Sequence, residues 1–496
     1  MMGSSVSRHN SDGKTTRRGF FERVSDGIYG TALATVLSGD FYGSLSPLRA
    51  APAVDDLPEG HRRVYDLKPR PTHFPPKAKA VIHLYMNGGP SQVDLFDPKP
   101  KLEKHDGENY ETAGGVADVD HSGKLLRSPF AFKQYGKSGT WVSELMPHVA
   151  EHVDDIALIR SMYTVHFNHE QALFMIHSGR PIPGRPSMGS WVVFGLGTVN
   201  QNLPAYVVLD DPLGLPINAT WNWQNGFLPP LYQGTRLRSV RSPILDLRPD
   251  FEKPAEVMNA ERDLISRLDR IHKRSHPNDL QLDARIASYE LAARLQLEAS
   301  DALDIGKETA ATREMYGIGQ EPTESYGRRC LMARRLVERG VRFVQLYING
   351  QIWDNHTSLE GGLRDASQRT DKPVAALLAD LKQRGLLDST LVIWGGEFGR
   401  SPIAQTDAGP SAGRDHNPKG FSLWMAGGGV KPGVVYGSTD EIGYESVENK
   451  VSVTDWHATI LHLLGLDYQQ LVFDQSGLKE KLTSVYEARI VKEILA

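Results

Sequence analysis

The sequence predicts an α/β protein built on an open, mostly parallel sheet that is flanked by helices. Two apolar, β-branched runs, VRFVQLYI from Val341 and STLVIWGG from Ser389, each lead into a Gly-rich or polar turn. Between them lies TDKPVAALLADLKQRG, an amphipathic helical segment that ends at Gly385. A strand, a helix and a strand in this order predict a right-handed parallel crossover. A third run, FSLWMAGGG from Phe421, has the same apolar character.

Length and composition limit the number of domains, the class of partner and the possible cysteine chemistry. The chain has 496 residues, which predicts one large domain with irregular and helical insertions or two closely joined domains. Hydrophobic residues make up 40% and charged residues 23%, and the net charge of -4 gives no basis for a nucleic-acid partner. The single cysteine, Cys330, excludes an internal disulfide and a cysteine metal cluster. Its helical setting, RRCLMARRL, favours an inert buried thiol.

The first fifty residues resemble a targeting signal and not part of the folded domain. Arg17 and Arg18 precede Phe20 and Phe21, and the run GIYGTALATVL that follows is too short to span a bilayer. Twin-arginine export to the periplasm or the exterior is one interpretation, and a disordered basic tail is the other. We therefore expect a signal and linker over 1–53 and the α/β domain over 54–496, with a helical insertion at about 254–340. No other segment is apolar for long enough to cross a membrane.

Polar residues that can bind metal accompany the three apolar runs. Asp354 and His356 follow the first, Glu397 follows the second, and His416 lies beside the third. In an open parallel sheet the ligand-binding and catalytic residues lie at the carboxyl ends of the strands. We therefore expect these four side chains to meet at that edge. Singly, each has an ordinary structural role as a helix cap, a turn acid or a loop histidine. Their joint occurrence favours a metal site.

The run AKAVIHLYMNGG, residues 78–89, predicts a first core strand that breaks at a sharp loop. Asn87 and Asp94 are candidates to complete the metal shell, and Ser91 is a candidate for the substrate side. For Asp94 and Asp97 the alternative is turn capping, which short polar side chains often perform.

A second candidate region is NHEQALFMIHSGR. Asn168 stands where a helix N-cap would be, so His169 falls at a helix N-terminus, where free N–H groups favour an anion such as phosphate or sulfate. His166, His169 and His177 lie within twelve residues of one another. This density favours a functional role for His169 over a purely structural one.

Several motifs resemble a known family. GLLDSTLVIWGGEFGR, DHNPKGFSLWMAGGGVKPG and VTDWHATILHLLGL resemble segments of the alkaline phosphatase and sulfatase superfamily. NGGPSQVDLFDPKP, NHEQALFMIHSGR, WDNHTSLEGG, GGEFGRSP and GRDHNPKGFS are similar to motifs of domain of unknown function 1501, DUF1501, whose members are twin-arginine, sulfatase-like bacterial proteins. The match covers roughly residues 78–470.

The resemblance implies an alkaline phosphatase-like fold and an exported, metal-dependent hydrolase of sulfate or phosphate esters. Its substrate would be a small anionic ester or a sulfated glycan. Glu397 falls on the superfamily's metal-binding Asp, and His416 falls on its metal-binding His. One or two divalent cations are implied, and the mixed His and carboxylate set favours Zn²⁺ or Mn²⁺ over Ca²⁺.

The sequence also departs from that pattern. His169 occupies the nucleophile position, where sulfatases carry a Cys or Ser, so it is either the catalytic nucleophile or a further ligand. Phe398 replaces one ligand histidine and Asn87 replaces the first-strand Asp. Arg400 and Arg414 are candidates to contact the anion, with a salt bridge as the alternative. The competing hypothesis is a non-catalytic anion- or glycan-binding pseudoenzyme on the same fold.

Overall fold

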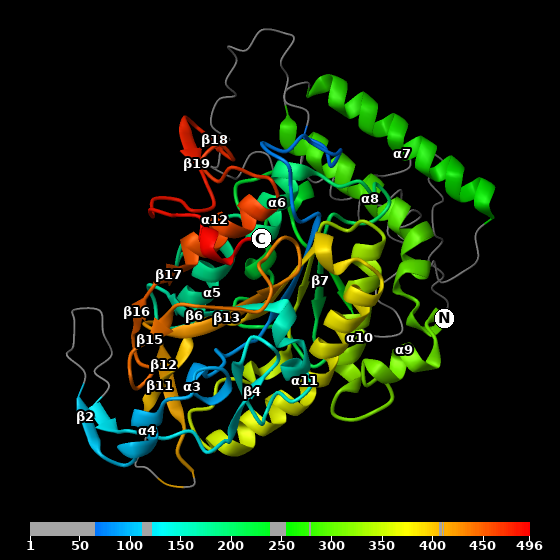
Figure 1. Ribbon diagram of the computed structural model, residues 1–496. Coiled ribbons are helices and arrows are strands. Elements are labelled where there is room, and N and C mark those ends of the chain that lie inside the picture. The colour runs from blue at the N-terminus through cyan, green and yellow to red at the C-terminus, as the bar shows by residue number, and fades with distance from the viewer. Residues whose placement is uncertain (1–64, 112–121, 239–253, 277–278, 406–408, 410) are drawn as a thin grey trace, which may run out of the picture. The chain divides into compact units, whose positions relative to one another are not determined.

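The computed structural model describes residues 65–111, 122–238, 254–276, 279–405, 409 and 411–496 (Figure 1). The chain divides into two compact units, one of residues 1–62 and 245–278 and the other of residues 63–244 and 279–496. Among the described elements, only helix α7 (Ala255–Ser275) belongs to the first unit. The predicted export signal and linker, residues 1–53, lie outside the described residues.

The larger unit is built on a nine-stranded sheet with the order β14-β6-β13-β10-β1-β9-β7-β8, and β17 pairs with β6 beside this path. Every pairing is parallel except those of β13, which is antiparallel to both β10 and β6. The predicted α/β class and mostly parallel sheet are confirmed. The strands are β1 (Ala80–Tyr85), β6 (Ile156–Tyr163), β7 (Tyr206–Asp210), β8 (Thr235–Arg238), β9 (Phe343–Leu346), β10 (Thr390–Gly395), β13 (Phe421–Ala426), β14 (Val434–Tyr436) and β17 (Val451–Ser452).

Helices cover both faces of this sheet (Figure 1). Strand β1 shows why: Ile82 and Leu84 join one apolar cluster, while Val81 and Tyr85 join the other, as a strand's period of two requires. The first cluster includes residues of α10 (Glu324–Glu338) and α11 (Leu359–Gln383). The second includes residues of α5 (His169–Ser178), α6 (Met188–Leu196) and α12 (Val453–Leu463).

Residues 254–340 contain α7, α8 (Leu280–Leu303), α9 (Ala310–Met315) and α10. Cys330 in α10 is buried, and burial raises the pKa of its thiol, as expected of an inert group. Strands β7 and β8, which lie between residues 206 and 238, are two members of the central sheet. None of the helices in the described residues is long and apolar enough to cross a membrane.

Short elements complete the larger unit. The helices α3 (Gln92–Leu95) and α4 (Pro100–Lys104) follow β1. Five two-stranded sheets pair β2 (Asn109–Glu111) with β3 (Ser122–Lys124), β4 (Phe132–Tyr135) with β5 (Thr140–Ser143), β11 (Gly399–Ala404) with β12 (Arg414–Asn417), β15 (Ser438–Thr439) with β16 (Ser446–Glu448), and β18 (Phe473–Gln475) with β19 (Leu478–Glu480).

Three histidines are buried between the sheet and the helices of its second face. His83, His177 and His457 are each at most 3% exposed. Burial, together with the positive charge that a neighbouring His457 would carry, lowers the pKa of His83 to about 3. Burial likewise lowers the pKa of His457 to about 4, and it holds the pKa of His177 well below its usual value. All three are therefore neutral in the folded protein at pH 7.

Because these pKa values are lower in the folded than in the unfolded chain, the unfolded chain takes up protons first as the pH falls. The stabilisation is complete above about pH 6.5 and is lost below it, at up to about 1.4 kcal/mol per pH unit for each histidine. Urea unfolding with a chelator present should therefore show lower stability at pH 5.5 than at pH 7.5. The slope should decrease in His83→Phe, and equal stability at the two pH values would contradict the assignment.

Candidate metal centre

The carboxyl edge of the central sheet brings the predicted residues together. Asp354 and His356 lie in the loop after β9, and Glu397 follows β10. His416 lies on β12, just before β13. Since β13 runs antiparallel to β10, the beginning of β13 lies at the same edge as the end of β10. Helix α5 brings His169 there as its first residue, with Asn168 as the N-cap, as predicted.

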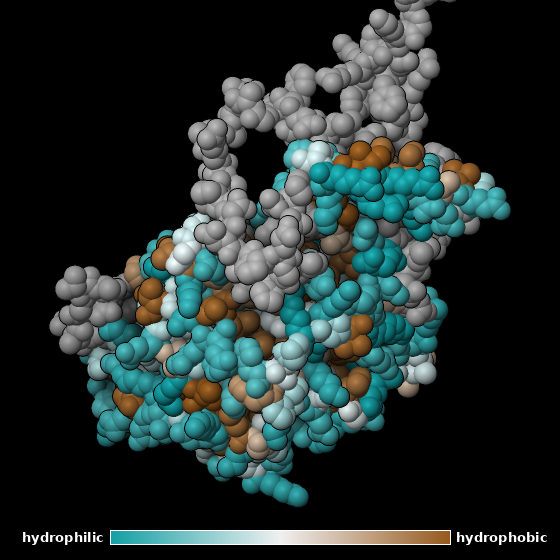
Figure 2. All heavy atoms as spheres, turned by 90° about the horizontal axis from the view of Figure 1, so that it is seen from above, coloured by the Kyte–Doolittle hydropathy of each residue, from teal (hydrophilic) through white to brown (hydrophobic). Residues whose placement is uncertain are grey.

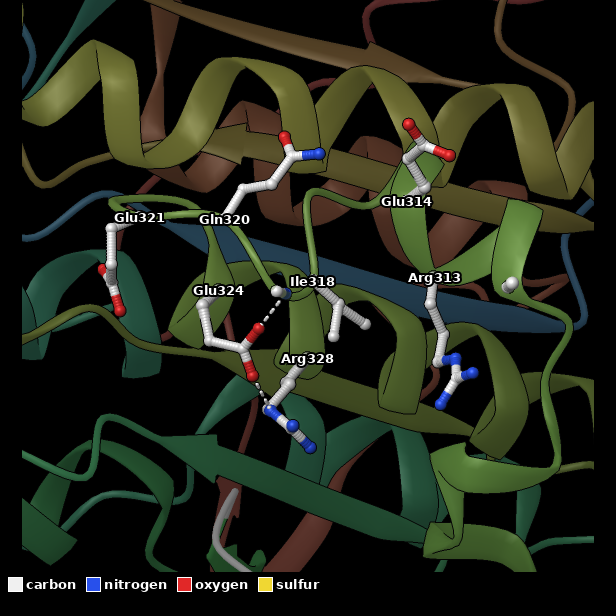
Figure 3. A pocket seen from close by; sticks show the side chains of 9 residues that line it. Arg313, Glu314, Ile318, Gln320, Glu321, Glu324 and Arg328 are labelled. Carbon is white, nitrogen blue, oxygen red and sulfur yellow. Dashed lines mark hydrogen bonds and ion pairs between the residues drawn. The ribbon is translucent and has the colours of Figure 1, made fainter.

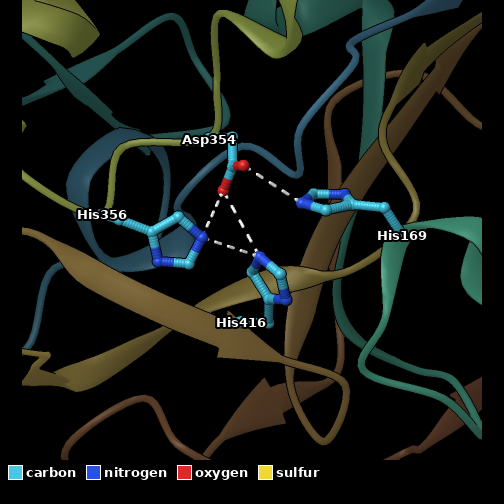
Figure 4. Close-up of side chains that lie close together, drawn as sticks. All are labelled: His169, Asp354, His356 and His416. Atoms are coloured by element: carbon cyan, nitrogen blue, oxygen red, sulfur yellow. Dashed lines mark hydrogen bonds and ion pairs between the residues drawn. The ribbon is translucent and has the colours of Figure 1, made fainter. Parts of the chain in front are cut away.

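Four of these side chains form one compact group, shown in Figure 4: His169, Asp354, His356 and His416 offer ligand atoms that all lie within 4.8 Å of one another. Asp354 Oδ1 is 2.8 Å from His356 Nε2 and 3.3 Å from His416 Nε2. Asp354 Oδ2 is 3.2 Å from His169 Nε2, and the Nε2 atoms of His356 and His416 are 3.0 Å apart. We call these four residues the His₃Asp cluster.

In each histidine, Nδ1 points away from the centre of the cluster and lies next to a hydrogen-bond acceptor. His169 Nδ1 lies 2.7 Å from Glu397 Oε1, His416 Nδ1 lies 2.8 Å from the carbonyl oxygen of Phe167, and His356 Nδ1 contacts Gln405 Oε1. Since these oxygens can only accept, each Nδ1 carries the proton it donates. In the neutral form of each ring, which is the form that binds metal, the Nε2 lone pair then faces the centre.

The spacing fits a single ion. A tetrahedral site with bonds of about 2.0–2.2 Å places its ligand atoms roughly 3.3–3.6 Å apart. This spacing lies between the 2.8–3.3 Å separations around the two oxygens of Asp354 and the 4.8 Å that bounds the whole cluster. His169 Nε2 is buried and faces Asp354 Oδ2 at 3.2 Å. A cation at the centre would satisfy this nitrogen and would separate the Nε2 atoms of His356 and His416.

Asp354 carries the negative charge of the cluster, and the buried Arg400 lies beside it. Burial opposes the ionisation of Asp354, but hydrogen bonds from three histidines and the charge of Arg400 outweigh it and hold the pKa of this carboxyl far below its usual range. Burial lowers the pKa of Arg400 itself. The Arg400 guanidinium contacts Asp354 Oδ1 and three backbone carbonyls, so it fixes the carboxylate, and at 1% exposed it is closed to an anion from solvent.

The three histidines differ in basicity. Burial alone would lower the pKa of His169, but its bonds to Asp354 and Glu397 raise it to about 9. The bond to Asp354 also raises the pKa of His356. Burial lowers the pKa of His416, and the charges of Arg400 and His169 add to this effect. Without an ion, His169 is therefore protonated at pH 7, and its proton takes part of the role of the cation.

Glu397, expected as a ligand, lies behind the cluster. It is 1% exposed, and its two oxygens accept from Tyr85 Oη at 2.7 Å, Gly88 N at 3.1 Å and His169 Nδ1 at 2.7 Å. This geometry makes it the carboxylate that orients His169 through Nδ1. The resemblance implies a metal-binding Asp at this position, and the longer side chain of Glu397 reaches His169 Nδ1 instead.

Tyr85, at the end of β1, was not singled out by the sequence. Removing its hydroxyl in Tyr85→Phe leaves Glu397 Oε2 without this donor and loosens His169, so affinity for Zn²⁺ or Mn²⁺ should fall about 10-fold to 100-fold. Tyr347→Phe is the matched control, because Tyr347 is equally buried but its hydroxyl contacts His177 Nε2 at 3.1 Å. Chelator competition measures both affinities. Equal affinities in the two variants would contradict the role of Tyr85.

The structure pairs two other candidates with each other. Asp94 and Arg414 form a two-pronged ion pair at 2.7 and 3.0 Å in which both side chains are 0% exposed. Ser91 Oγ donates to Asp94 at 2.5 Å. The structure therefore places Asp94, Ser91 and Arg414 in a buried polar core beside the His₃Asp cluster and not within it. Asp97 likewise pairs with Lys99 and Arg160.

Asn87 lies in the turn that follows β1. Its Nδ2 donates to the carbonyl oxygen of Ile348 at 2.6 Å, while Oδ1 is buried without a hydrogen-bond partner. Phe398 stands where the resemblance implies a ligand histidine, and its ring centroid lies 4.9 Å from that of His169 and 4.6 Å from that of His416. An apolar ring thus occupies this side of the cluster.

Two glycines allow the loop of Asp354 and His356 to approach. A Cβ at Gly88, where φ is +108°, would lie 2.6 Å from Asp354 N. A Cβ at Gly413 would lie 2.1 Å from the carbonyl carbon of His356. The NGG turn after β1 and the glycine before β12 are therefore required for the backbone of this loop to reach its position.

A cavity of about 560 Å³ lies elsewhere, in the segment from α9 to α10 (Figure 3). Glu324 in its wall accepts from Gly319 N and Arg328 Nε. No predicted site residue lines it. Its remaining wall is formed by Ala310, Arg313, Glu314, Ile318, Gln320 and Glu321.

Solved structures similar to this chain include a sulfatase, a phosphonate monoester hydrolase and an alkaline phosphatase, at low identity. The PsFucS1 sulfatase from Pseudoalteromonas sp. is 14% identical, with 84% of this chain and 72% of that chain covered and a TM-score of 0.38. The phosphonate monoester hydrolase SpPMH from Silicibacter pomeroyi is 10% identical, with coverage of 84% and 76% and a TM-score of 0.34. The alkaline phosphatase from the Antarctic bacterium TAB5 is 12% identical, with coverage of 73% and 94% and a TM-score of 0.28.

TM-scores at this level transfer neither substrate nor ligands. No curated protein matches the chain. One family model matches residues 78–495, most of the sequence, and includes every residue of the His₃Asp cluster. The chain belongs to the family described as protein of unknown function, DUF1501.

Proposed function

We propose that the His₃Asp cluster binds one divalent cation, Zn²⁺ or Mn²⁺, and that the protein is a hydrolase of sulfate or phosphate esters. The observation that carries the metal site is the common orientation of three histidines, each donating from Nδ1 to a fixed acceptor and each directing Nε2 to Asp354. Three imidazoles and a carboxylate suit Zn²⁺ or Mn²⁺ better than Ca²⁺, which prefers oxygen.

The proposal assigns a role to each side chain. His169, His356, His416 and Asp354 are ligands, and Arg400 fixes Asp354. When bound, the cation supplies Lewis-acid polarisation of an ester oxygen and activation of water. His356 is the most exposed member, at 33%, so a substrate oxygen would approach from its side.

Of the two roles left open for His169, nucleophile and ligand, this proposal takes the ligand role. Its Nδ1 is committed to Glu397 and its Nε2 faces Asp354, the geometry of a ligand. The four members of the His₃Asp cluster are three imidazoles and a carboxylate, and this proposal uses all of them as ligands. The proposed attacking group is therefore water, and the chain's contribution is to hold the ion, to orient the ester and to accept the proton.

Two assays separate the hydrolase from the anion-binding pseudoenzyme. Elemental analysis of the purified protein should find about one Zn or Mn per chain, and His169→Ala should lose it while His105→Ala, an exposed histidine outside the cluster, keeps it. A panel of aryl sulfates and aryl phosphates should then show turnover that His169→Ala abolishes. Bound metal and anion without turnover would instead establish the pseudoenzyme, and an unchanged metal content in His169→Ala would end the proposal.

Export is a separate part of the proposal and rests on Arg17 and Arg18 followed by Phe20 and Phe21. Expression of the full chain in a bacterium with and without twin-arginine transport tests it. Periplasmic protein that disappears in the transport mutant, or in Arg17→Lys/Arg18→Lys, is the expected result. An entirely cytoplasmic protein in both hosts would contradict it.

A further inference from the structure

The exposed side of the His₃Asp cluster is bordered by polar groups. Teal, hydrophilic side chains cover most of the described surface that Figure 2 shows from above, with apolar ones scattered among them. Within the cluster, exposure is greatest at His356, at 33%, and the neighbours of this ring are the exposed Gln405 and the carboxylate of Asp415, which is 26% exposed. Because these neighbours are polar, charge is the property by which this side can distinguish one anion from another.

Asp415 has no part in the proposed function, yet it is fixed beside two of the ligands. Its Oδ1 accepts a hydrogen bond from the backbone N–H of His416 at 2.7 Å and lies 3.9 Å from His356 Nδ1. That Nδ1 already has Gln405 Oε1 as its hydrogen-bond acceptor. Gln405 therefore orients the ring, and Asp415 adds a negative charge on the outer side of His356.

The charges around the cluster are balanced once a divalent cation is bound. Within the part of the chain that the structure describes, three charged side chains pair with the cluster from outside: Arg400 with Asp354, Glu397 with His169, and Asp415 with His356. With the carboxylate of Asp354 itself, the site holds three carboxylates and one guanidinium. The histidines are neutral when they bind metal, so one divalent cation makes the positive and negative charges equal in number. The pair of Asp94 and Arg414 adds no net charge.

We infer that Asp415 is a specificity-determining residue, whose carboxylate makes the metal-loaded site neutral so that it selects singly charged over doubly charged tetrahedral anions. Sulfate monoesters and phosphate diesters carry one negative charge, whereas a phosphate monoester carries about -1.5 to -2 at pH 7. The second charge of a monoester would stay uncompensated beside three carboxylates, because the one guanidinium, that of Arg400, is buried against Asp354. This role of Asp415 rests on the proposed metal site and narrows the class of ester that the site accepts.

Two inert anions of the same shape test this selection without turnover. Benzenesulfonate carries one charge, and benzenephosphonate carries two at about pH 8.5, above the second pKa of its phosphonate group. Calorimetric titration of the zinc-loaded full chain with each anion gives the two dissociation constants, and the wild type should bind benzenesulfonate at least as tightly as benzenephosphonate. In Asp415→Asn the affinity for the sulfonate should rise about 3-fold to 10-fold and that for the phosphonate about 10-fold to 100-fold, because the Coulomb energy is proportional to the charge of the ligand.

Two further variants separate charge from structure. Asp415→Glu keeps the charge and should keep the wild-type ratio of the two affinities, and Asp106→Asn, which removes an exposed carboxylate outside the cluster, should leave the ratio unchanged. A purely structural role of Asp415 would change both affinities by the same factor. That result would overturn the inference, as would a wild type that binds the phosphonate about 10-fold or more tightly than the sulfonate, or one that binds neither anion.

Turnover is measured separately, on the sulfate monoester, the phosphate diester and the phosphate monoester of one aryl alcohol. The first two should be hydrolysed in preference to the third, and their relative rates show which singly charged ester the site prefers. If none is hydrolysed while the binding ratio responds to Asp415→Asn as expected, the hydrolase proposal fails and the anion selection stands. Hydrolysis together with a binding ratio that Asp415→Asn leaves unchanged would instead overturn the role of Asp415 alone.

Discussion

Asp354→Asn should abolish tight metal binding. Asp354 is the one residue that contacts all three histidines of the His₃Asp cluster, and its charge is what favours a cation among them. Affinity for Zn²⁺ should fall by more than the roughly 10–100-fold that loss of an outer-shell partner costs. Any ester hydrolysis should fall with it.

The same substitution should destabilise the metal-free protein by about 2–4 kcal/mol, because it leaves Arg400, which is 1% exposed, without its carboxylate. Chelator competition and urea unfolding measure the two effects. Asp97→Asn is the matched control, since Asp97 is also buried and ion-paired but lies outside the cluster. It should reduce stability without changing metal affinity. Unchanged zinc affinity in Asp354→Asn would show that the cluster is not a metal site.

Asp94→Asn should be among the most destabilising single substitutions in the chain, at about 3–5 kcal/mol. It removes the charge opposite Arg414 where neither side chain is exposed, and a buried guanidinium then remains unpaired. The metal content of the folded fraction should stay the same, because Asp94 bonds to Ser91 and Arg414 and not to the cluster.

An exposed pair provides the comparison. Asp106 lies 3.4 Å from Arg127, and the two side chains are 38% and 54% exposed, so Asp106→Asn should cost less than about 1 kcal/mol. Urea midpoints of the two variants decide between the structural role and the ligand role that the sequence suggested for Asp94. Loss of metal from folded Asp94→Asn would restore the ligand role.

Much of the fold was accessible from sequence because its signals are local. β-branched runs ended by glycines predicted β1, β9 and β10, and the amphipathic segment between β9 and β10 predicted α11. The order of these elements gave the parallel sheet and the edge at which Asp354, His356, Glu397 and His416 would gather. The antiparallel direction of β13 was not predicted, because a strand's own pattern carries no information on its direction relative to its neighbours.

The roles within the site were less accessible, because they depend on distances of a few ångströms. Glu397 and Asp94 look equally suitable as ligands in sequence, yet one holds His169 and the other neutralises Arg414. Arg400 and Arg414 look suitable for an anion, but backbone carbonyls and carboxylates satisfy both. Tyr85 has no signal beyond its place as an inward-facing residue at the end of β1.

Anomalous diffraction from crystals grown with Zn²⁺ tests the central claim most directly. We predict one strong peak at the zinc edge, about 2.0–2.2 Å from the Nε2 atoms of His169, His356 and His416 and from an Asp354 carboxylate oxygen. Glu397 should remain bonded to His169 Nδ1. An empty cluster at saturating zinc, or a peak whose ligands include Glu397 or Asp94 in place of His169, would contradict the account.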